Sequence, residues 1–181
     1  MRRQVESIGD AISVIGTGQI ARWAQLMLYA ERDGIAPHDD PLVFQVLVRA
    51  RMMEIVARMS RPGDLRLAER AFMTGMLSKI DVLLGRSLPE TLAELPLAAE
   101  VRLALCERDG DLGRLLQLCE ACERVDEALI QRLCRSTGYS GIAGVVEAEA
   151  QAASWAIATT DALRTVSGGE TPPRGRAAAA A

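Results

Sequence analysis

The sequence has little histidine, few aromatic residues and no excess of positive charge. His38 is the one histidine among 181 residues, and Phe, Trp and Tyr together make up 3% of the chain. A multi-histidine metal centre therefore cannot be built from this polypeptide, because other side chains replace imidazole poorly as a ligand. Lys and Arg number 21 against 24 Asp and Glu, so the charge balance argues against a nucleic-acid partner.

Long uncharged apolar segments are also lacking. No such run approaches the roughly 20 residues that a helix needs to span a bilayer. Near the N-terminus, Glu6 and Asp10 interrupt the apolar segment that a signal peptide would need. We therefore expect a cytoplasmic protein without membrane contact. The four cysteines lie in stretches of helical periodicity, where we expect reduced thiols rather than disulfides: Cys106, Cys119, Cys122 and Cys134.

The hydrophobic content of the chain is high, at 49%. This content is sufficient for one compact domain with a sizeable core. Leucine and alanine dominate it, which favours packed helices over strands. We therefore predict an all-α fold, with one helical domain over residues 1–166. Residues 167–181 lose all periodicity and contain Pro172 and Pro173, which predicts a disordered tail.

The strongest helical pattern runs from Arg66 to Leu84. Apolar residues recur there at three- and four-residue steps, which predicts one long buried helix on which its neighbours pack. Similar patterns predict further helices over Ile8–Ile15, Gly18–Glu31, Leu42–Ser60, Ser87–Pro96, Leu97–Glu107, Leu112–Arg124, Asp126–Ser136 and Val145–Val166, the last with Trp155 on its apolar side. Gly, Pro and Asp residues predict the connections at Arg32–Pro41, Ser60–Gly63, Arg108–Asp111 and Gly138–Gly144.

The predicted long helix also carries a resemblance to a known family. Its residues Ala71, Phe72, Gly75, Met76 and Leu77 are similar to the central helix of the HDOD domain, a relative of the HD phosphohydrolases. In the related motif a His–Asp pair follows, whereas Ser78 and Lys79 stand at those positions here. The resemblance therefore implies a degenerate metal position, no catalytic residues, no cofactor and no enzymatic activity.

Two other segments extend this resemblance to roughly Val5–Arg135. Ser7–Trp23 is similar to the segment that precedes the central helix in many HDOD domains. Leu83–Leu105 resembles the HDOD type fused behind an EAL domain in cyclic-di-GMP signalling proteins. Helices that HDOD domains normally carry ahead of these segments are missing, so the resemblance implies a domain incomplete at its N-terminus. It further implies a non-catalytic signalling or protein-interaction module whose partner is an EAL-type domain, with a homo-oligomer as a further expectation.

The missing helices suggest where a partner would bind. We expect them to leave an apolar groove that receives a partner helix, lined by residues such as Trp23, Met27, Phe72 and Met76.

Two other functions remain as alternatives. The first is residual phosphodiesterase or phosphohydrolase activity, which would need metal ligands absent from the degenerate motif. The second is dinucleotide binding, because Gly16, Gly18 and Ala21 spell the G-x-G-x-x-A pattern, with Asp39 or Asp40 at a suitable distance. That motif requires a strand before Gly16, whereas the downstream sequence has helical periodicity.

Two further patterns could be taken for metal sites. His38–Asp39 is a literal His–Asp dipeptide, but it lies in a predicted polar loop without a second histidine. Cys119-x-x-Cys122, together with Cys106 and Cys134, has the composition of a four-thiolate zinc site. The sequence around the two central cysteines is helical rather than turn-like, so we interpret them as packing residues.

Overall fold

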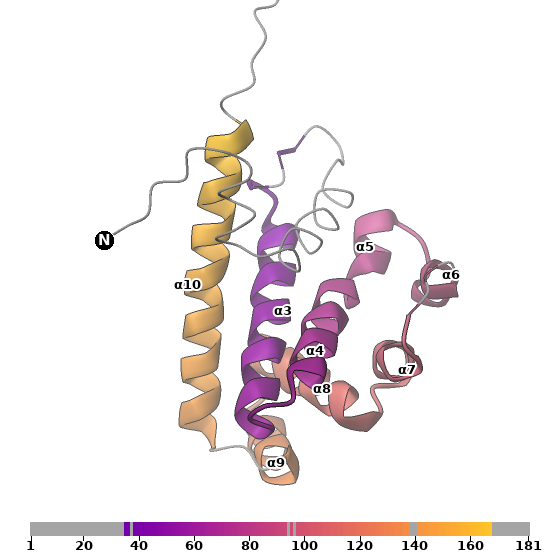
Figure 1. Ribbon diagram of the computed structural model, residues 1–181, viewed down its shortest axis with the longest axis vertical. Helices are drawn as coiled ribbons and strands as arrows, with labels where there is room; N and C mark the ends of the chain where they lie inside the picture. Colours follow the sequence, from indigo (N-terminus) through magenta and orange to yellow (C-terminus); the bar gives the residue numbers. More distant parts are fainter. Residues whose placement is uncertain (1–34, 37, 94, 96, 138–140, 168–181) are drawn as a thin grey trace, which may run out of the picture.

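All regular elements in the described part of the chain are helices (Figure 1). The computed structural model describes residues 35–36, 38–93, 95, 97–137 and 141–167. The all-α prediction is confirmed over these ranges. The predicted helices Ile8–Ile15 and Gly18–Glu31, and with them the Gly16–Ala21 motif, lie outside the described residues. In the described ranges, no helix is both long and apolar enough to cross a membrane.

Helix α3, Pro41–Ser60, lies between α4 and the last helix, α10 (Figure 1). Its start is fixed by Asp40, whose side chain accepts a hydrogen bond from the Leu42 amide, and by Pro41 in the first turn. Apolar residues occupy most of its circumference, and side chains are buried continuously from Met52 to Ala57. A helix that is apolar on nearly all sides has to be surrounded, which explains its central position.

The predicted single helix Arg66–Leu84 is wrong in one respect: it is two helices. Helix α4 spans Leu65–Leu77 and helix α5 spans Ile80–Leu84. The Ser78 hydroxyl donates a hydrogen bond to the Gly75 carbonyl at 2.7 Å, and Lys79 leaves the helical conformation with φ −129° and ψ 21°. A serine that bonds its own preceding turn competes with the regular helical ladder, and the break falls at the degenerate His–Asp position.

Gly75 allows α3 and α4 to approach closely. A Cβ atom at this position would lie 2.5 Å from the Ala50 Cα, well inside van der Waals contact. Glycine is normally unfavourable in a helix interior. Its presence here is explained by the short distance between the two helix backbones.

The remaining helices begin and end within a few residues of their predicted bounds. They are α6 Leu88–Ala93, α7 Ala99–Glu107, α8 Gly110–Glu123, α9 Glu127–Thr137 and α10 Ile142–Ser167. Two predicted connections are shorter than expected. The Asp109 side chain accepts a hydrogen bond from the Gly110 amide, so α8 begins at Gly110 inside the predicted turn. Residues 142–144 of the predicted glycine-rich turn already belong to α10.

The buried apolar side chains of the described residues form a larger and a smaller cluster. Helix α10 runs along α3 (Figure 1) and contributes to the smaller cluster. The Trp155 ring of α10 packs edge-on against Phe72 of α4, with ring centroids 6.1 Å apart. Trp155 is thus on the inward side, as predicted from the sequence. The larger cluster is formed mainly by α3, α4, α7, α8 and α9, and its residues include Met53, Leu105 and Leu116.

Candidate functional site

Ser78, which the HDOD resemblance places at a degenerate His–Asp position, lies where α3, α4 and α8 meet. Arg49 of α3 is 5% exposed and binds Glu123 of α8 through two parallel hydrogen bonds, Nε to Oε1 at 2.7 Å and Nη2 to Oε2 at 2.6 Å. Its Nη1 donates to the Ser78 Oγ at 2.8 Å. The guanidinium group therefore joins three helices from one point. We call Arg49, Ser78 and Glu123 the buried triad.

The partners of Arg49 are themselves held in place. The Ser78 hydroxyl accepts from Arg49 and donates to the Gly75 carbonyl, which uses its one proton. Glu123, whose side chain is 26% exposed, also accepts from the Gln45 amide at 3.1 Å. Two-point arginine–carboxylate contacts are the most directional of the charged hydrogen bonds. The buried triad therefore fixes the relative positions of the three helices.

Lys79, the other residue of the degenerate pair, does not take part. Its side chain is half-buried and makes no hydrogen bond or ion pair with any described residue. The two residues therefore have different roles. Ser78 binds Arg49 at the junction of α3, α4 and α8, whereas the backbone of Lys79 forms the turn into α5.

At the buried triad, the hydrogen bonds of Arg49 hold the side chains of Ser78 and Glu123 in place. Arginine stays protonated in proteins and cannot act as a base or a metal ligand. Among the described residues, no group of three or more His, Cys, Asp or Glu side chains is arranged to hold a metal ion.

The predicted interaction groove does not involve two of its expected residues. Phe72 and Met76 are each 1% exposed and belong to the cluster between α3, α4 and α10. Their place in the core leaves them no open surface for a partner. Trp23 and Met27, the other two residues of the predicted groove, lie outside the described residues.

His38 and Asp39 connect the segment before α3 to the end of α10. The His38 Nε2 lies 3.4 Å from Asp39 Oδ2, and Asp39 also accepts a hydrogen bond from Arg164 at 3.1 Å. Arg164 stands near the end of α10. The literal His–Asp dipeptide is therefore part of a surface contact between chain segments, and it is separate from the Ser78–Lys79 position.

The cysteines are distributed over three helices rather than gathered at a turn. Cys119 and Cys134 are buried, Cys122 is partly buried and Cys106 is exposed; all four are free thiols. Burial raises the pKa of Cys119 well above its ordinary value. Burial, with the nearby charge of Glu149, raises the pKa of Cys122 to about 12. The raised pKa values make both thiols weak nucleophiles at neutral pH.

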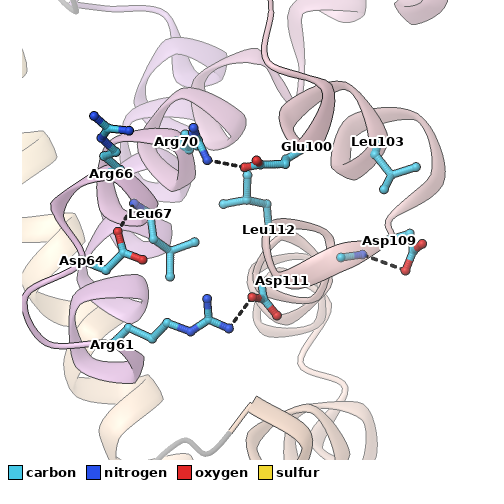
Figure 2. A pocket seen from close by; sticks show the side chains of 11 residues that line it. Arg61, Asp64, Arg66, Leu67, Arg70, Glu100, Leu103, Asp109, Asp111 and Leu112 are labelled. Atoms are coloured by element: carbon cyan, nitrogen blue, oxygen red, sulfur yellow. Dashed lines mark hydrogen bonds and ion pairs between the residues drawn. The ribbon is translucent and has the colours of Figure 1, made fainter.

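A cleft of about 450 Å³ opens between α4 and the pair α7 and α8 (Figure 2). Its apolar floor includes Leu67 and Leu112, and its charged rim comes from α4, α7, α8 and the connections before α4 and α8. On the rim, Arg70 of α4 is paired with Glu100 of α7, and Arg61 after α3 is paired with Asp111 of α8. Figure 2 shows these two pairs reaching across the cleft from opposite walls.

The charges of the cleft remain exposed to solvent. All four paired side chains keep between 39% and 61% of their surface exposed. Slight burial of Asp111 acts to raise its pKa, but hydrogen bonds and charge from Arg114 and Arg61 outweigh it, and the pKa lies below its ordinary value. Arg61 and Asp111 both lie in segments that the sequence predicts as connections between helices. No spacing signal relates these two turns, so the cleft was not predictable from pattern.

Two curated proteins share part of this sequence. Cyclic di-GMP phosphodiesterase CdgJ of Vibrio cholerae is 44% identical over 71 residues, which are 39% of this chain and 16% of that protein. The uncharacterized protein YuxH of Bacillus subtilis is 32% identical over 126 residues, which are 68% of this chain and 30% of that protein. The chain thus spans less than a third of the length of either relative. No family profile and no solved structure matches the chain, so the HDOD resemblance remains a prediction.

Proposed function

We propose that this chain is a non-catalytic signalling module that binds and regulates an EAL-type domain of the cyclic-di-GMP system. The EAL domain would lie in the same polypeptide or in a separate protein. The observation that carries the proposal is the buried triad at the degenerate His–Asp position. Where the resemblance leads one to expect metal ligands, this chain has a permanently charged guanidinium that is hydrogen-bonded to Ser78 and Glu123.

The comparison with CdgJ supports the signalling context. CdgJ is by its name a cyclic-di-GMP phosphodiesterase, and a 71-residue region of it is related to part of this chain. The aligned region is 16% of CdgJ and is therefore far shorter than the whole enzyme. We infer that the shared region serves cyclic-di-GMP signalling through regulation rather than through hydrolysis.

The charged cleft is the part of the described surface that we assign to the partner. Its apolar floor offers contact area, and its exposed ion pairs can be exchanged for pairs with another protein at little cost. Arg66, also on the rim, makes no ion pair with any described residue. Among the described residues, the cleft therefore offers an arginine without an ion pair, Arg66, beside two exposed arginine–carboxylate pairs that can exchange partners. This combination suits a partner surface that carries carboxylates.

A binding assay tests this proposal. The chain is immobilised, and an EAL domain from the same source is passed over it. We expect specific binding that weakens with salt, because exposed charges are screened. Arg66→Glu in the cleft should weaken binding about tenfold or more, as expected when a favourable contact becomes repulsive. Arg132→Glu, on the exposed side of α9, is the matched control and should bind normally. Absence of binding would contradict the proposed partner, and equal effects of both variants would contradict the cleft.

Residual hydrolase activity is the second candidate, favoured by the name of the CdgJ relative. It predicts metal-dependent turnover of cyclic-di-GMP by this chain alone. Hydrolysis that requires Mg²⁺ or Mn²⁺ and that is lost on chelation would establish this candidate, and it would require ligands other than the buried triad.

A further inference from the structure

Four carboxylates line the cleft, and they bind two different kinds of group. Asp64 and Asp109 accept hydrogen bonds from backbone amides at the starts of α4 and α8, so their role is to cap helices. Glu100 and Asp111 bind arginine side chains instead (Figure 2). The second kind therefore occupies cationic groups that the cleft would otherwise offer to a partner.

The arginines concerned are each held by a carboxylate on the facing wall. Arg70 of α4 donates through Nη1 to Glu100 of α7, and Arg61 donates through Nη2 to Asp111 of α8. Asp111 also binds Arg114 of its own helix. Neither Arg61 nor Arg70 forms an ion pair with any other described residue. A carboxylate from a partner would therefore have to replace Glu100 or Asp111 in order to bind them.

Such a replacement is easy because the pairs are partly exposed to water. An exposed ion pair changes an equilibrium constant by at most about fivefold. The internal pairs are thus strong enough to compete with the carboxylates of a partner, but they are too weak to exclude them. The cleft differs in this respect from the buried triad, whose arginine has little access to water.

Arg70 also lines a second hollow, of about 270 Å³, between α4 and the start of α7. Met73, Leu97 and Val101 are among its lining residues. The side chain that Glu100 holds is therefore shared by the cleft and this hollow, and both offer apolar surface beside it. An occupant with a carboxylate flanked by apolar side chains suits this arrangement.

We propose that Glu100 and Asp111 are internal competitors, which hold Arg70 and Arg61 until an acidic and apolar segment of the partner displaces them. This inference rests on the proposed function, because it concerns how the EAL-type partner enters the cleft. The free chain binds its partner less tightly than its arginines alone would allow. Removal of these two charges should consequently strengthen binding, whereas truncation of a residue in a contact normally weakens it.

The test uses the full chain with Glu100→Gln and Asp111→Asn, which remove both charges and keep the size of the side chains. In the EAL-binding assay this double variant should bind about tenfold more tightly, because each released arginine contributes up to about fivefold. The matched control, Glu90→Gln with Glu127→Gln, gives the same net charge. Both control residues are exposed and form no ion pair with a described residue, so this variant should bind as the unchanged chain does.

A probe peptide separates this inference from the identity of the partner. The peptide alternates glutamate and leucine, and a second peptide has glutamine in place of glutamate. Fluorescence anisotropy should show that the acidic peptide binds the double variant more tightly than the unchanged chain, with no such gain for the uncharged peptide. Adding Arg70→Gln to Glu100→Gln should abolish the gain that Glu100→Gln gives alone, because that gain acts through the released Arg70.

The outcomes distinguish the two proposals. If the EAL domain does not bind but the acidic peptide binds the double variant more tightly, the proposed partner is wrong and the internal competition stands. If neither ligand gains affinity, or if the matched control gains as much, the internal competition is wrong whether or not the EAL domain binds. A gain that survives Arg70→Gln would also overturn it.

Discussion

The arginine–carboxylate pairs of the buried triad and of the cleft both join helices, and they differ mainly in their exposure to water. Arg49 in the buried triad is 5% exposed, whereas Arg61 and Arg70 at the cleft are 55% and 40% exposed. Loss of a partner leaves Arg49 charged in a dry environment, but it leaves the cleft arginines hydrated. The same chemical group therefore fixes the fold at one place and leaves a surface free to exchange partners at the other.

The largest expected effect comes from breaking the buried triad on its carboxylate side. Glu123→Ala should destabilise folding by about 2–4 kcal/mol, because it strands the buried Arg49 charge without its carboxylate. Arg49→Met should cost less, since the Glu123 side chain can be hydrated where it is exposed. Urea unfolding followed by circular dichroism measures both. Equal costs for the two variants would show that burial does not distinguish the partners.

A double substitution sharpens this result. Arg49→Met combined with Glu123→Leu removes both charges, so it should recover most of the stability lost in Glu123→Ala. Failure to recover would show that the triad contributes through packing rather than through charge.

The next largest effect is expected from Gly75→Ala, which acts on the helix contact beside the triad. In an ordinary helix interior this change stabilises by about 1 kcal/mol. Here the new methyl group would lie 2.5 Å from the Ala50 Cα, so we expect destabilisation by about 1–3 kcal/mol. Thermal unfolding gives the sign directly. A rise in melting temperature would contradict the close approach of α3 and α4.

Ser78→Ala should have a smaller effect of about 1–2 kcal/mol, because Arg49 loses one of its three hydrogen bonds. Ser154→Ala is the matched control: Ser154 also bonds the preceding helical turn, but it is exposed on α10 and accepts nothing from an arginine. We expect no loss of stability there. If both variants behave alike, Ser78 is only a local helix-bending residue.

At the cleft, the same type of substitution should scarcely affect stability. Arg70→Ala and Glu100→Ala should each change the free energy of unfolding by less than about 1 kcal/mol, as exposed pairs do. Chemical denaturation of the two single variants and the double variant gives their coupling energy. A coupling as large as that of Arg49 and Glu123 would remove the distinction between the two sets of pairs.

The smallest effect concerns the pH dependence of Asp111. Its pKa is lower in the folded state than the ordinary value of 3.8. Its contribution to stability is therefore complete above that ordinary value and is lost as the pH falls through the lower folded value. In melting curves recorded at decreasing pH, Asp111→Asn should lack this part of the acid destabilisation. An unchanged acid profile would mean that Arg61 and Arg114 do not hold the carboxylate in solution.

Helix positions were largely predictable because their signals are local. The bounds of α3, α7 and α9 follow from apolar periodicity and from the turn residues between helices, and the inward side of Trp155 follows from the same pattern. The break between α4 and α5 was not predictable, because apolar residues continue in helical register across Ser78. At the break, the Ser78 hydroxyl bonds both the Gly75 carbonyl and Arg49 of another helix, and the second of these contacts has no signal in the sequence pattern.

The candidate sites were predictable only in part. The resemblance pointed to Ser78, but it did not indicate what would replace the missing metal ligands. Arg49 and Glu123 are 74 residues apart, and each has the appearance of an ordinary charge on an amphipathic helix. Their pairing is a consequence of tertiary packing. Phe72 and Met76 were expected at a surface because absent helices were expected to uncover them, whereas α3 and α10 cover both.

Under the proposed function, this chain regulates cyclic-di-GMP turnover without performing it. The most direct measurement compares cyclic-di-GMP hydrolysis by an EAL domain from the same source, by this chain alone with Mg²⁺ or Mn²⁺, and by the two together. We predict no turnover by this chain alone and a changed rate for the EAL domain in its presence. Metal-dependent turnover by this chain, or an EAL rate that does not change at saturating concentrations of it, would contradict the claim.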